Sequence, residues 1–373
     1  MPLPKLYSKD SHGRIRSWEI IVEGNSYKTI AGLEDGAKVT SEPTVCLGKN
    51  LGRANETSPE AQAEKEAKSH WNKKVGQEGY FENVEEVDTQ TFFNVMLAHE
   101  YEKHSHKLPE TIWASPKMDG LRCVISKEGV FSRNGKKFPA LSYIREELQP
   151  LFKLAPNIIL DSEAYTHTLK SNFDKLVSLA KKLKPTREEI EEAKKYELSA
   201  WIFDMPQGGI YTINDPFKER YLAAESFFAG FTFKFSRLLK YDVCTKTDVH
   251  LVEENYIKEG FEGLMARNPH AAYQQKRSYD LLKLKRFIDV ELPIIDILKG
   301  DGNRSGMMGR MVFHMDGKPF EASARGNEEF YRELLNNKTK YIGALATIRY
   351  QNLTPSGVPR FPIVVMINRG EYE

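Results

Sequence analysis

Short runs in which apolar and polar residues alternate fill much of the chain, and residues that favour turns separate them. Between about residues 110 and 287 these runs mix with helical segments such as FKERYLAAESFFAGF. A period of two predicts strands with one buried face. The central part is therefore predicted to be an α+β domain with antiparallel sheets, built on the runs WASPKMDGLRCVIS, NIILDSEAY, SAWIFDM, EGLMAR and LLKLKRF.

The pattern changes at about Asp289, where short strands follow one another with Gly and Pro between them. Such strands predict a small barrel of about five strands, formed by ELPIIDIL, GRMVFHMDG, PFEASARG, LATIRY and PIVVMI. The stretch GDGNRSGMMG is predicted to be a barrel loop, because it lacks the strand-to-helix pattern of a phosphate-binding loop.

The N-terminal stretch predicts a small module of strands followed by one helix. SWEIIVEG alternates as a strand does, and Thr57 or Ser58 can cap a helix that has Pro59 in its first turn. Gly76 and Gly79 are expected to end this helix.

A helical linker is expected next, with a helix from roughly Asp88 to His106. In the central domain, KPTREEIEEAKKYE predicts an exposed helix in which Thr186 and Glu189 have capping-box spacing. The predicted division of the chain is 1–85, 86–109, 110–288 and 289–373.

Charge and cysteine content limit the class of protein. The sequence has 54 Lys and Arg against 52 Asp and Glu, so it has no uniformly polycationic surface and any basic surface must be local. Three scattered cysteines exclude a disulfide framework and a cysteine zinc site. No apolar run suits a membrane span or a secretory signal, so we expect a protein of the cytoplasm of a prokaryotic or phage-infected cell, without membrane contact.

The string KMDGLR places Lys117, Asp119 and Arg122 around one tight turn, although a plain surface turn would explain it equally well. A lysine with an ordinary pKa of about 10.4 is neutral in only about one molecule in a thousand near pH 7.4. A nucleophilic lysine therefore needs neighbours that lower its pKa. Lys283 and Lys285 would place two ammonium groups on one face of a strand.

Three acids lie on strand-like segments between these lysines: Glu163, Asp204 and Glu262. Each alone could be an ordinary exposed carboxylate. Together with the lysines they would form a site for a polyphosphate, a ribose and a divalent cation, because Mg²⁺ takes oxygen ligands and bridges phosphates. Phe203 offers an aromatic face to a base.

These motifs occur in a characteristic order: KMDGLR, SRNG, LDSEAY, WIFDM, EGLMAR and LLKLKRF. In this order and spacing the chain resembles ATP-dependent DNA ligases of the covalent nucleotidyltransferase superfamily, of the small phage or bacterial type. The likeness covers about residues 110–373. It implies an α+β fold with a nucleotidyltransferase domain of the ATP-grasp-like adenylation type, followed by an OB-fold β-barrel that includes the PRFP segment.

The resemblance also implies roles for individual residues. Lys117 is the expected adenylylated nucleophile, Phe203 stacks on adenine, and Glu163 contacts the ribose. The residues expected to bind ATP are Lys117, Arg122, Glu163, Phe203, Glu262, Lys283 and Lys285. The expected catalytic residues are Lys117, Asp119, Lys283 and Lys285, and the expected ligands of Mg²⁺ or Mn²⁺ are Glu262 and Glu163. The expected DNA contacts are Arg133, Arg277, Arg304, Arg310, Arg360, Lys49 and Arg53.

Both ends of the chain depart from the small-ligase pattern. The N-terminal module resembles a divergent WGR-type domain, which implies DNA binding, although the motif is present only as LGR at residues 51–53. Its basic residues could equally form a solvated helix face: Lys49, Arg53, Lys65, Lys68, Lys73 and Lys74. At the other end Arg369 is followed by GEYE, which leaves open whether the tail orients pyrophosphate.

The function implied is sealing of 5′-phosphate/3′-hydroxyl nicks in duplex DNA by a monomer that uses ATP and forms a lysyl-AMP intermediate. The alternatives within the superfamily are an RNA ligase and a capping guanylyltransferase. A non-catalytic DNA-binding protein with a ligase-like fold is the alternative from another class. An NAD-dependent ligase is disfavoured by the low cysteine content and the short chain.

Overall fold

The computed structural model describes residues 2–10, 13–50, 52, 55–89, 92–301 and 304–367. Thr91–Arg286 forms one compact unit, and the stretches on either side of it, Met1–Gln90 and Phe287–Glu373, form the other. Within the described residues, no helix has both the length and the apolar content that crossing a bilayer demands.

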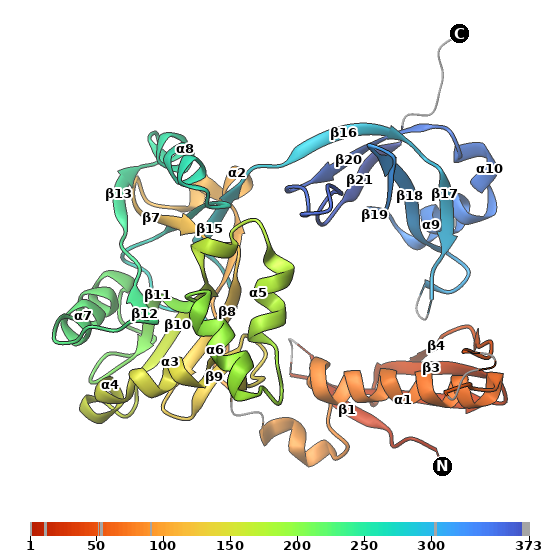
Figure 1. Ribbon diagram of the computed structural model, residues 1–373, viewed down its shortest axis with the longest axis horizontal. Helices are drawn as coiled ribbons and strands as arrows, with labels where there is room; N and C mark the ends of the chain where they lie inside the picture. The colour runs from red at the N-terminus through yellow and green to blue at the C-terminus, as the bar shows by residue number, and fades with distance from the viewer. Residues whose placement is uncertain are drawn as a thin grey trace, which may run out of the picture. The chain divides into compact units, whose positions relative to one another are not determined.

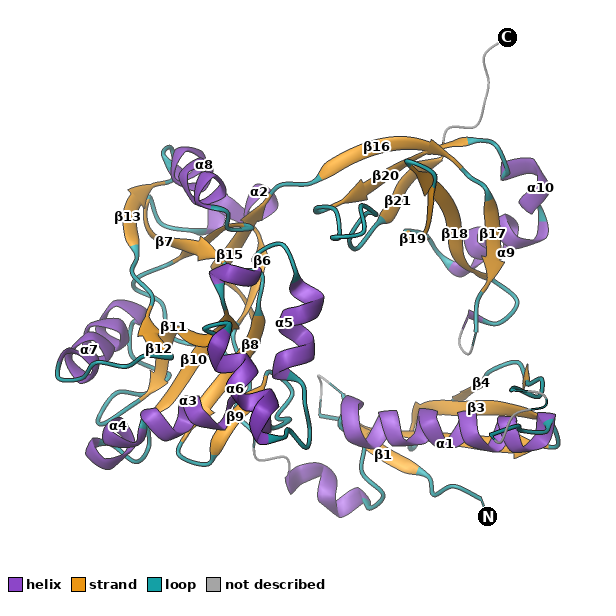
Figure 2. Cartoon of the chain, in the orientation of Figure 1, coloured by secondary structure: helices purple, strands orange, loops and turns teal. Residues whose placement is uncertain are grey.

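The central unit contains two five-stranded sheets (Figures 1 and 2). Most neighbouring strands are antiparallel, as predicted, but β12 pairs with β11 and β6 with β15 in parallel. The first sheet has the order β12 (Ser236–Leu238), β11 (Ser199–Gln207), β10 (Ile159–Tyr165), β8 (Leu121–Ser126), β9 (Gly129–Ser132). The second has the order β13 (Asp242–Thr245), β7 (Thr111–Lys117), β14 (Gly263–Arg267), β15 (Arg277–Lys285), β6 (Leu97–Glu100).

Each sheet of the central unit has its own hydrophobic core. Side chains such as Leu160 and Ile202 of the first sheet pack with those of nearby helices, which include α3 (Ser142–Glu147), α4 (Gln149–Leu154), α5 (Phe173–Ala180), α6 (Arg187–Lys195) and α7 (Phe217–Ala229). Leu264 and Leu282 of the second sheet pack with Tyr256 of α8 (Val249–Glu259). Since each sheet has a separate core, polar side chains can lie between the two sheets.

The predicted helix at Thr186 is confirmed as α6, and its capping box is present. The predicted helix from Asp88 to His106 is wrong. This segment contains a 3₁₀ turn (Val84–Thr89), strand β6 and the short helix α2 (Tyr101–His104). Strand β6 forms because its backbone pairs with β15, which lies far along the chain, and such pairing overrides local helix propensity.

The N-terminal module is an antiparallel sheet along which helix α1 (Pro59–Glu78) lies (Figure 2). Ser58 caps α1 by accepting a hydrogen bond from the Ala61 amide, and Gly79 ends it in the left-handed conformation. The helix continues through Gly76, so the expectation that Gly76 ends it is wrong. The strands are β1 (Leu6–Lys9), β2 (Ile15–Glu23), β3 (Ser26–Leu33), β4 (Lys38–Thr40) and β5 (Thr44–Val45).

The C-terminal domain contains one sheet of six strands, where a small barrel of about five strands was predicted. The run ELPIIDIL breaks at residues 294–295, so its two halves become strands that pair with different partners. The sheet order is β16 (Ile288–Pro293), β20 (Leu345–Tyr350), β21 (Ile363–Ile367), β19 (Lys318–Ala324), β18 (Met308–Met315), β17 (Asp296–Lys299). Helices α9 (Glu328–Asn336) and α10 (Lys338–Tyr341) precede β20. The described residues of the predicted Gly-rich stretch before Met308 lie between β17 and β18, and residues 302–303 lie outside the described part of the chain.

A cluster of buried charges lies in the first sheet of the central unit. Asp161 of β10 and Asp204 of β11 are paired across the strands, and both are fully buried. Asp204 accepts hydrogen bonds from the buried guanidinium groups of Arg220, at 2.9 and 3.1 Å, and Arg267, at 2.5 Å. Asp204 was predicted to belong to the polyphosphate site, but here its role is to compensate these two arginines.

We therefore expect Asp204→Ala to destabilise the central unit. Removing one partner leaves two buried guanidinium groups without their carboxylate, which costs about 3–5 kcal/mol. Chemical denaturation followed by tryptophan fluorescence would measure this loss. Glu254→Ala breaks the exposed ion pair with Lys258 on α8 and should change stability by less than about 1 kcal/mol. Equal effects of the two substitutions would contradict the assignment.

Candidate active site

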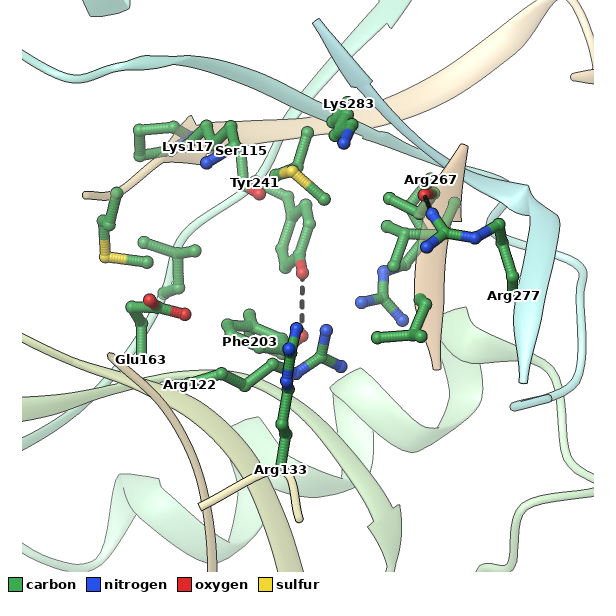
Figure 3. Close-up of a pocket in the computed structure, with 17 residues that line it drawn as sticks. Ser115, Lys117, Arg122, Arg133, Glu163, Phe203, Tyr241, Arg267, Arg277 and Lys283 are labelled. Atoms are coloured by element: carbon green, nitrogen blue, oxygen red, sulfur yellow. Dashed lines mark hydrogen bonds between the residues drawn. The ribbon is translucent and has the colours of Figure 1, made fainter. Parts of the chain in front are cut away.

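A pocket of about 300 Å³ lies in the central unit, lined by side chains from both sheets (Figure 3). Its walls combine apolar residues such as Met265 and Leu281 with many charged ones. Glu163 is the acid among the lining residues, whereas the basic ones are Lys117, Arg122, Arg133, Arg267, Arg277 and Lys283. A pocket with this lining suits a ligand that carries several negative charges and an apolar ring.

Lys117 is the last residue of β7, and in the register of the sheet it lies opposite Gly263 of β14, which in turn lies opposite Lys285 of β15. Glu262, immediately before Gly263, forms an ion pair with Lys117 and a longer one of 3.7 Å with Lys285. The Glu262 amide also donates to the Lys117 carbonyl oxygen at 2.9 Å. One carboxylate thus lies between two lysines that are separated by the width of two strands.

Gly263 makes this close arrangement possible. A Cβ atom at this position would lie 2.2 Å from the Leu284 carbonyl oxygen, closer than real atoms approach. Its φ of +157° is also one that side-chain-bearing residues rarely adopt. Only glycine therefore keeps β14 and β15 close enough to hold Lys117, Glu262 and Lys285 together.

Lys283 and Lys285 both lie near Lys117, as their spacing predicted. Burial lowers the pKa of each side chain, and the ammonium group of Lys117 lowers it further. Glu262 has the opposite effect on both and favours their charged forms. The lysines form a compact cationic group that is only partly neutralised.

The carboxylate of Asp161 fixes the Arg122 side chain at the pocket. Its guanidinium donates two hydrogen bonds to Asp161, at 2.9 and 2.5 Å, and lies 5.1 Å from the ring centroid of Phe203. The Tyr273 hydroxyl donates to the same carboxylate at 2.6 Å. Because burial and Asp161 raise the pKa of Tyr273, its hydroxyl remains a donor.

Glu163 is directly opposite Arg122 in the sheet and lines the pocket. Burial raises the pKa of this carboxyl to about 8, although Lys117 and Arg122 act in the opposite direction. Gly120 lies against it, since a Cβ there would be 2.7 Å from Glu163 Cγ. The tight turn of KMDGLR therefore packs directly on Glu163.

Two models of protein families, both of ligase domains, match the sequence of the chain. The model described as ATP dependent DNA ligase domain matches residues 95–285, and that described as DNA ligase OB-like domain matches residues 299–367. The first covers more than half of the chain. The chain belongs to the ATP-dependent DNA ligase family.

Individual proteins that are similar to this chain are also DNA ligases. A DNA ligase of Haemophilus influenzae is 24% identical over 275 residues, which cover 72% of this chain and 90% of the relative. A DNA ligase of African swine fever virus is 25% identical over 336 residues, covering 80% of this chain and 76% of the relative. A solved structure from a study of Lig E DNA ligases superimposes with a TM-score of 0.62 at 22% identity, covering 74% of this chain and 99% of that one. The family confirms the expected nucleotidyltransferase and OB-fold domains, and the chain is an ATP-dependent ligase.

The structure brings together most of the residues that the ligase resemblance singled out. Lys117, Arg122, Arg133, Glu163, Phe203, Arg277 and Lys283 line the pocket, and Glu262 and Lys285 adjoin Lys117. Asp119 is half-buried in the turn after β7 and is not among the lining residues. Arg277 donates a hydrogen bond to the Ala98 carbonyl oxygen at the pocket wall.

The expected DNA contacts outside the central unit have varied environments. Arg310 is exposed, whereas the guanidinium of Arg304 is 4.5 Å from the Tyr331 ring centroid and that of Arg360 is 4.7 Å from the Phe361 ring centroid. Lys49 forms a 2.8 Å ion pair with Glu66. Arg53 and the tail from residue 368 onward, with Arg369 and GEYE, lie outside the described residues.

Sequence reasoning missed several pocket residues. Arg267 ends the EGLMAR motif and could have been found there, because motif residues on one strand face share a neighbourhood. Tyr241 donates a 2.7 Å hydrogen bond to the Phe203 carbonyl oxygen (Figure 3), but it lies between strands where no pattern marks it. Ala98 was missed because its segment was predicted to be helical.

The raised pKa of Glu163 gives a pH prediction. A carboxyl whose pKa rises from 4.5 in the unfolded chain to about 8 in the fold binds a proton more tightly when folded, so its contribution to stability falls as pH rises through this interval. Glu163→Gln removes this dependence. We expect the Tm of wild type to fall relative to that of Glu163→Gln between about pH 5 and pH 8.5. A Tm difference that does not change with pH would show that Glu163 titrates normally.

Proposed function

We propose that this chain seals 5′-phosphate/3′-hydroxyl nicks in duplex DNA and that Lys117 carries AMP during the reaction. The observation that supports this most directly is the position of Lys117 at a cationic pocket, beside Glu262 and between the two sheets. Membership of the ATP-dependent DNA ligase family supports the reaction class.

In the first step the Lys117 amine attacks the α-phosphorus of ATP. An N–P bond forms, the bond to pyrophosphate breaks, and the amine loses a proton. Glu262 accepts a hydrogen bond from Lys117 and can receive that proton. The ammonium groups of Lys283 and Lys285 stabilise the negative charge that develops on the phosphate oxygens.

The remaining lining residues suit the nucleoside part of ATP. Phe203 provides an aromatic face for adenine, and its backbone is fixed by Tyr241. Glu163 can hydrogen-bond a ribose hydroxyl in either protonation state. Arg122, held by Asp161, directs a fixed positive charge toward phosphate oxygens.

Within the described residues, no group of three or more acids, histidines or cysteines is arranged to hold a metal ion. This fits Mg²⁺ or Mn²⁺, which binds through one or two carboxylates together with substrate phosphates. Glu262 and Glu163 are the carboxylates that fit this role. When bound, the metal supplies charge neutralisation at the phosphates.

AMP then passes from Lys117 to the 5′-phosphate of the nick, and the 3′-hydroxyl displaces AMP to form the phosphodiester bond. We assign Arg133 and Arg277, at the pocket wall, to the nick phosphate, and Arg304, Arg310 and Arg360 of the C-terminal domain to flanking phosphates. Asp119 is assigned to orienting the 3′-hydroxyl. One chain suffices for these steps, so we propose that the ligase acts as a monomer.

The N-terminal module is proposed to be a WGR-like domain that adds affinity for DNA. Lys65, Lys68 and Lys73 on α1 are exposed, so they are free to meet phosphates. The Lys49 side chain forms an exposed ion pair with Glu66, which contributes little and can be replaced by a phosphate contact.

We expect Lys117→Arg to abolish capture of AMP from ATP labelled at the α-phosphate, because a guanidinium stays protonated and cannot act as the nucleophile. Label retained on denatured protein measures this step. Lys127→Arg, at an exposed lysine of the same unit, should label as wild type does. Labelled Lys117→Arg protein would exclude Lys117 as the nucleophile. A wild type that folds but takes no label would instead support the non-catalytic alternative.

Arg277→Ala should separate nick contacts from nucleotide contacts. The side chain lies at the pocket wall where it donates to Ala98, so its loss should leave AMP capture largely intact while sealing falls at least about tenfold. Both activities are measured on the same preparation. An equal loss of both would place Arg277 at ATP rather than at the nick phosphate.

Replacing Lys65, Lys68 and Lys73 by alanine should weaken binding to nicked duplex without affecting AMP capture. Each lost phosphate contact should reduce the slope of log Kd against log salt by about one. Deleting residues 1–85 should likewise weaken DNA binding and therefore raise the KM for nicked DNA. An unchanged salt slope in the stably folded triple variant would rule out the DNA-binding role of α1.

A further inference from the structure

Strand β15 contains an irregularity beside the pocket. It pairs with β6 at Arg277 and Ser278 and resumes pairing only at Leu282, while its partner residues Ala98 and His99 are consecutive. Residues 279–281 are therefore left out of the pairing between β15 and β6, although Leu281 still pairs with Arg267 of β14. Bulges of this kind redirect side chains and are frequent next to active sites.

Hydrogen bonds to Asp280 fix the shape of this bulge. Its carboxylate accepts from the side chains of Asn268 at 2.8 Å, Gln274 at 3.0 Å and Ser278 at 3.2 Å. The backbone N–H of Asn268 also donates a hydrogen bond to the backbone carbonyl oxygen of Asp280 at 2.9 Å. The neighbouring Tyr279 is thus presented by a rigid backbone.

Tyr279 forms an aromatic platform with His99 and His104, which we call the Tyr279 platform. The rings of Tyr279 and His99 are stacked, 4.2 Å apart and inclined by 7°, and His104 lies edge-on 5.0 Å from each. Tyr279 is 45% exposed. No hydrogen bond joins the Tyr279 hydroxyl or the two imidazole rings to other residues among those described.

The surroundings of the Tyr279 platform are positively charged. Arg277 and Lys283 are close enough to lower the pKa of His99, after the larger effects of burial and of His104. Glu100 acts in the opposite direction, but it is paired with Lys103 at 2.5 Å. An anionic group would therefore be favoured here over a cation.

We propose that the Tyr279 platform binds the sugar-phosphate backbone of the DNA strand next to the nick. The exposed tyrosine ring would lie against a deoxyribose, and the unpaired imidazoles would donate to phosphate oxygens. This rests on the proposed nick-sealing function. ATP is a poorer occupant, because none of the three side chains is among those lining the pocket.

The same contact makes DNA affinity depend on pH. A phosphate favours the imidazolium form, so binding takes up a proton and raises the pKa of His99, which burial and the nearby His104 lower in the free protein. Affinity for nicked DNA should therefore rise as pH falls through this region. Well above the pKa of His99 its imidazole is neutral and this gain is absent.

The test measures the Kd of nicked duplex at about pH 6 and pH 8 for wild type, Tyr279→Leu, His104→Gln and the matched control His270→Gln, an exposed histidine of the same unit. At the lower pH Tyr279→Leu and His104→Gln should bind about three- to tenfold more weakly than wild type. His104→Gln should also shift the pH dependence, because His104 lowers the pKa of His99 in wild type. AMP capture should be unchanged, and His270→Gln should match wild type.

Wild-type Kd and pH dependence in both platform variants would overturn the proposal. If Tyr279→Leu loses its fold, His104→Gln alone decides by the same criteria. Failure of the proposed function would look different, because wild type itself would then neither capture AMP nor prefer nicked over intact duplex.

Discussion

Compensation of buried positive charge is the constraint on which this ligase depends. A pocket for a polyphosphate needs several cations between two sheets, yet burying unpaired cations in a fold is costly. Three carboxylates meet this demand. Asp161 holds Arg122, Asp204 holds Arg220 and Arg267, and Glu262 lies between Lys117 and Lys285. Lys117 and Arg122 line the pocket, whereas Asp161, Asp204 and Glu262 are not among its lining residues.

The buried carboxylates differ in the side chains that they contact. Asp204 is fully buried and committed to arginines, so it stabilises the fold. Glu262 is shared between two lysines, Lys117 and Lys285. Among the described residues, no ion pair or side-chain hydrogen bond joins Glu163 to another residue, and burial raises its pKa to about 8. The groups that each carboxylate contacts therefore distinguish these residues.

Close backbone packing gives the site its precision. Gly263 and Gly120 have no room for a Cβ atom, and each brings a charged residue against its neighbour: Glu262 beside Lys117, and Glu163 beside the KMDGLR turn. The bulge in β15 shows the opposite use of backbone geometry, since it moves Tyr279 out of the ladder to the surface. Strand β15 thus contributes both to the pocket, through Arg277, Leu281 and Lys283, and to the Tyr279 platform, through the interruption of its pairing with β6.

The sequence by itself determined the elements whose pattern is local. Period-two runs became β7, β8, β10, β11, β14 and β15, capping signals placed α1 and α6, and the ordered motifs identified Lys117, Glu262, Lys283 and Lys285 as neighbours. Only the tertiary structure decided the remainder. Strand β6 forms through pairing with residues about 180 positions away. The run ELPIIDIL is divided into two strands because its halves have different partners. Asp204 does not belong to the pocket because its carboxylate is hydrogen-bonded to Arg220 and Arg267. Each of these depends on contacts between distant segments, whose free energy outweighs local propensity and leaves no periodic signal in the sequence.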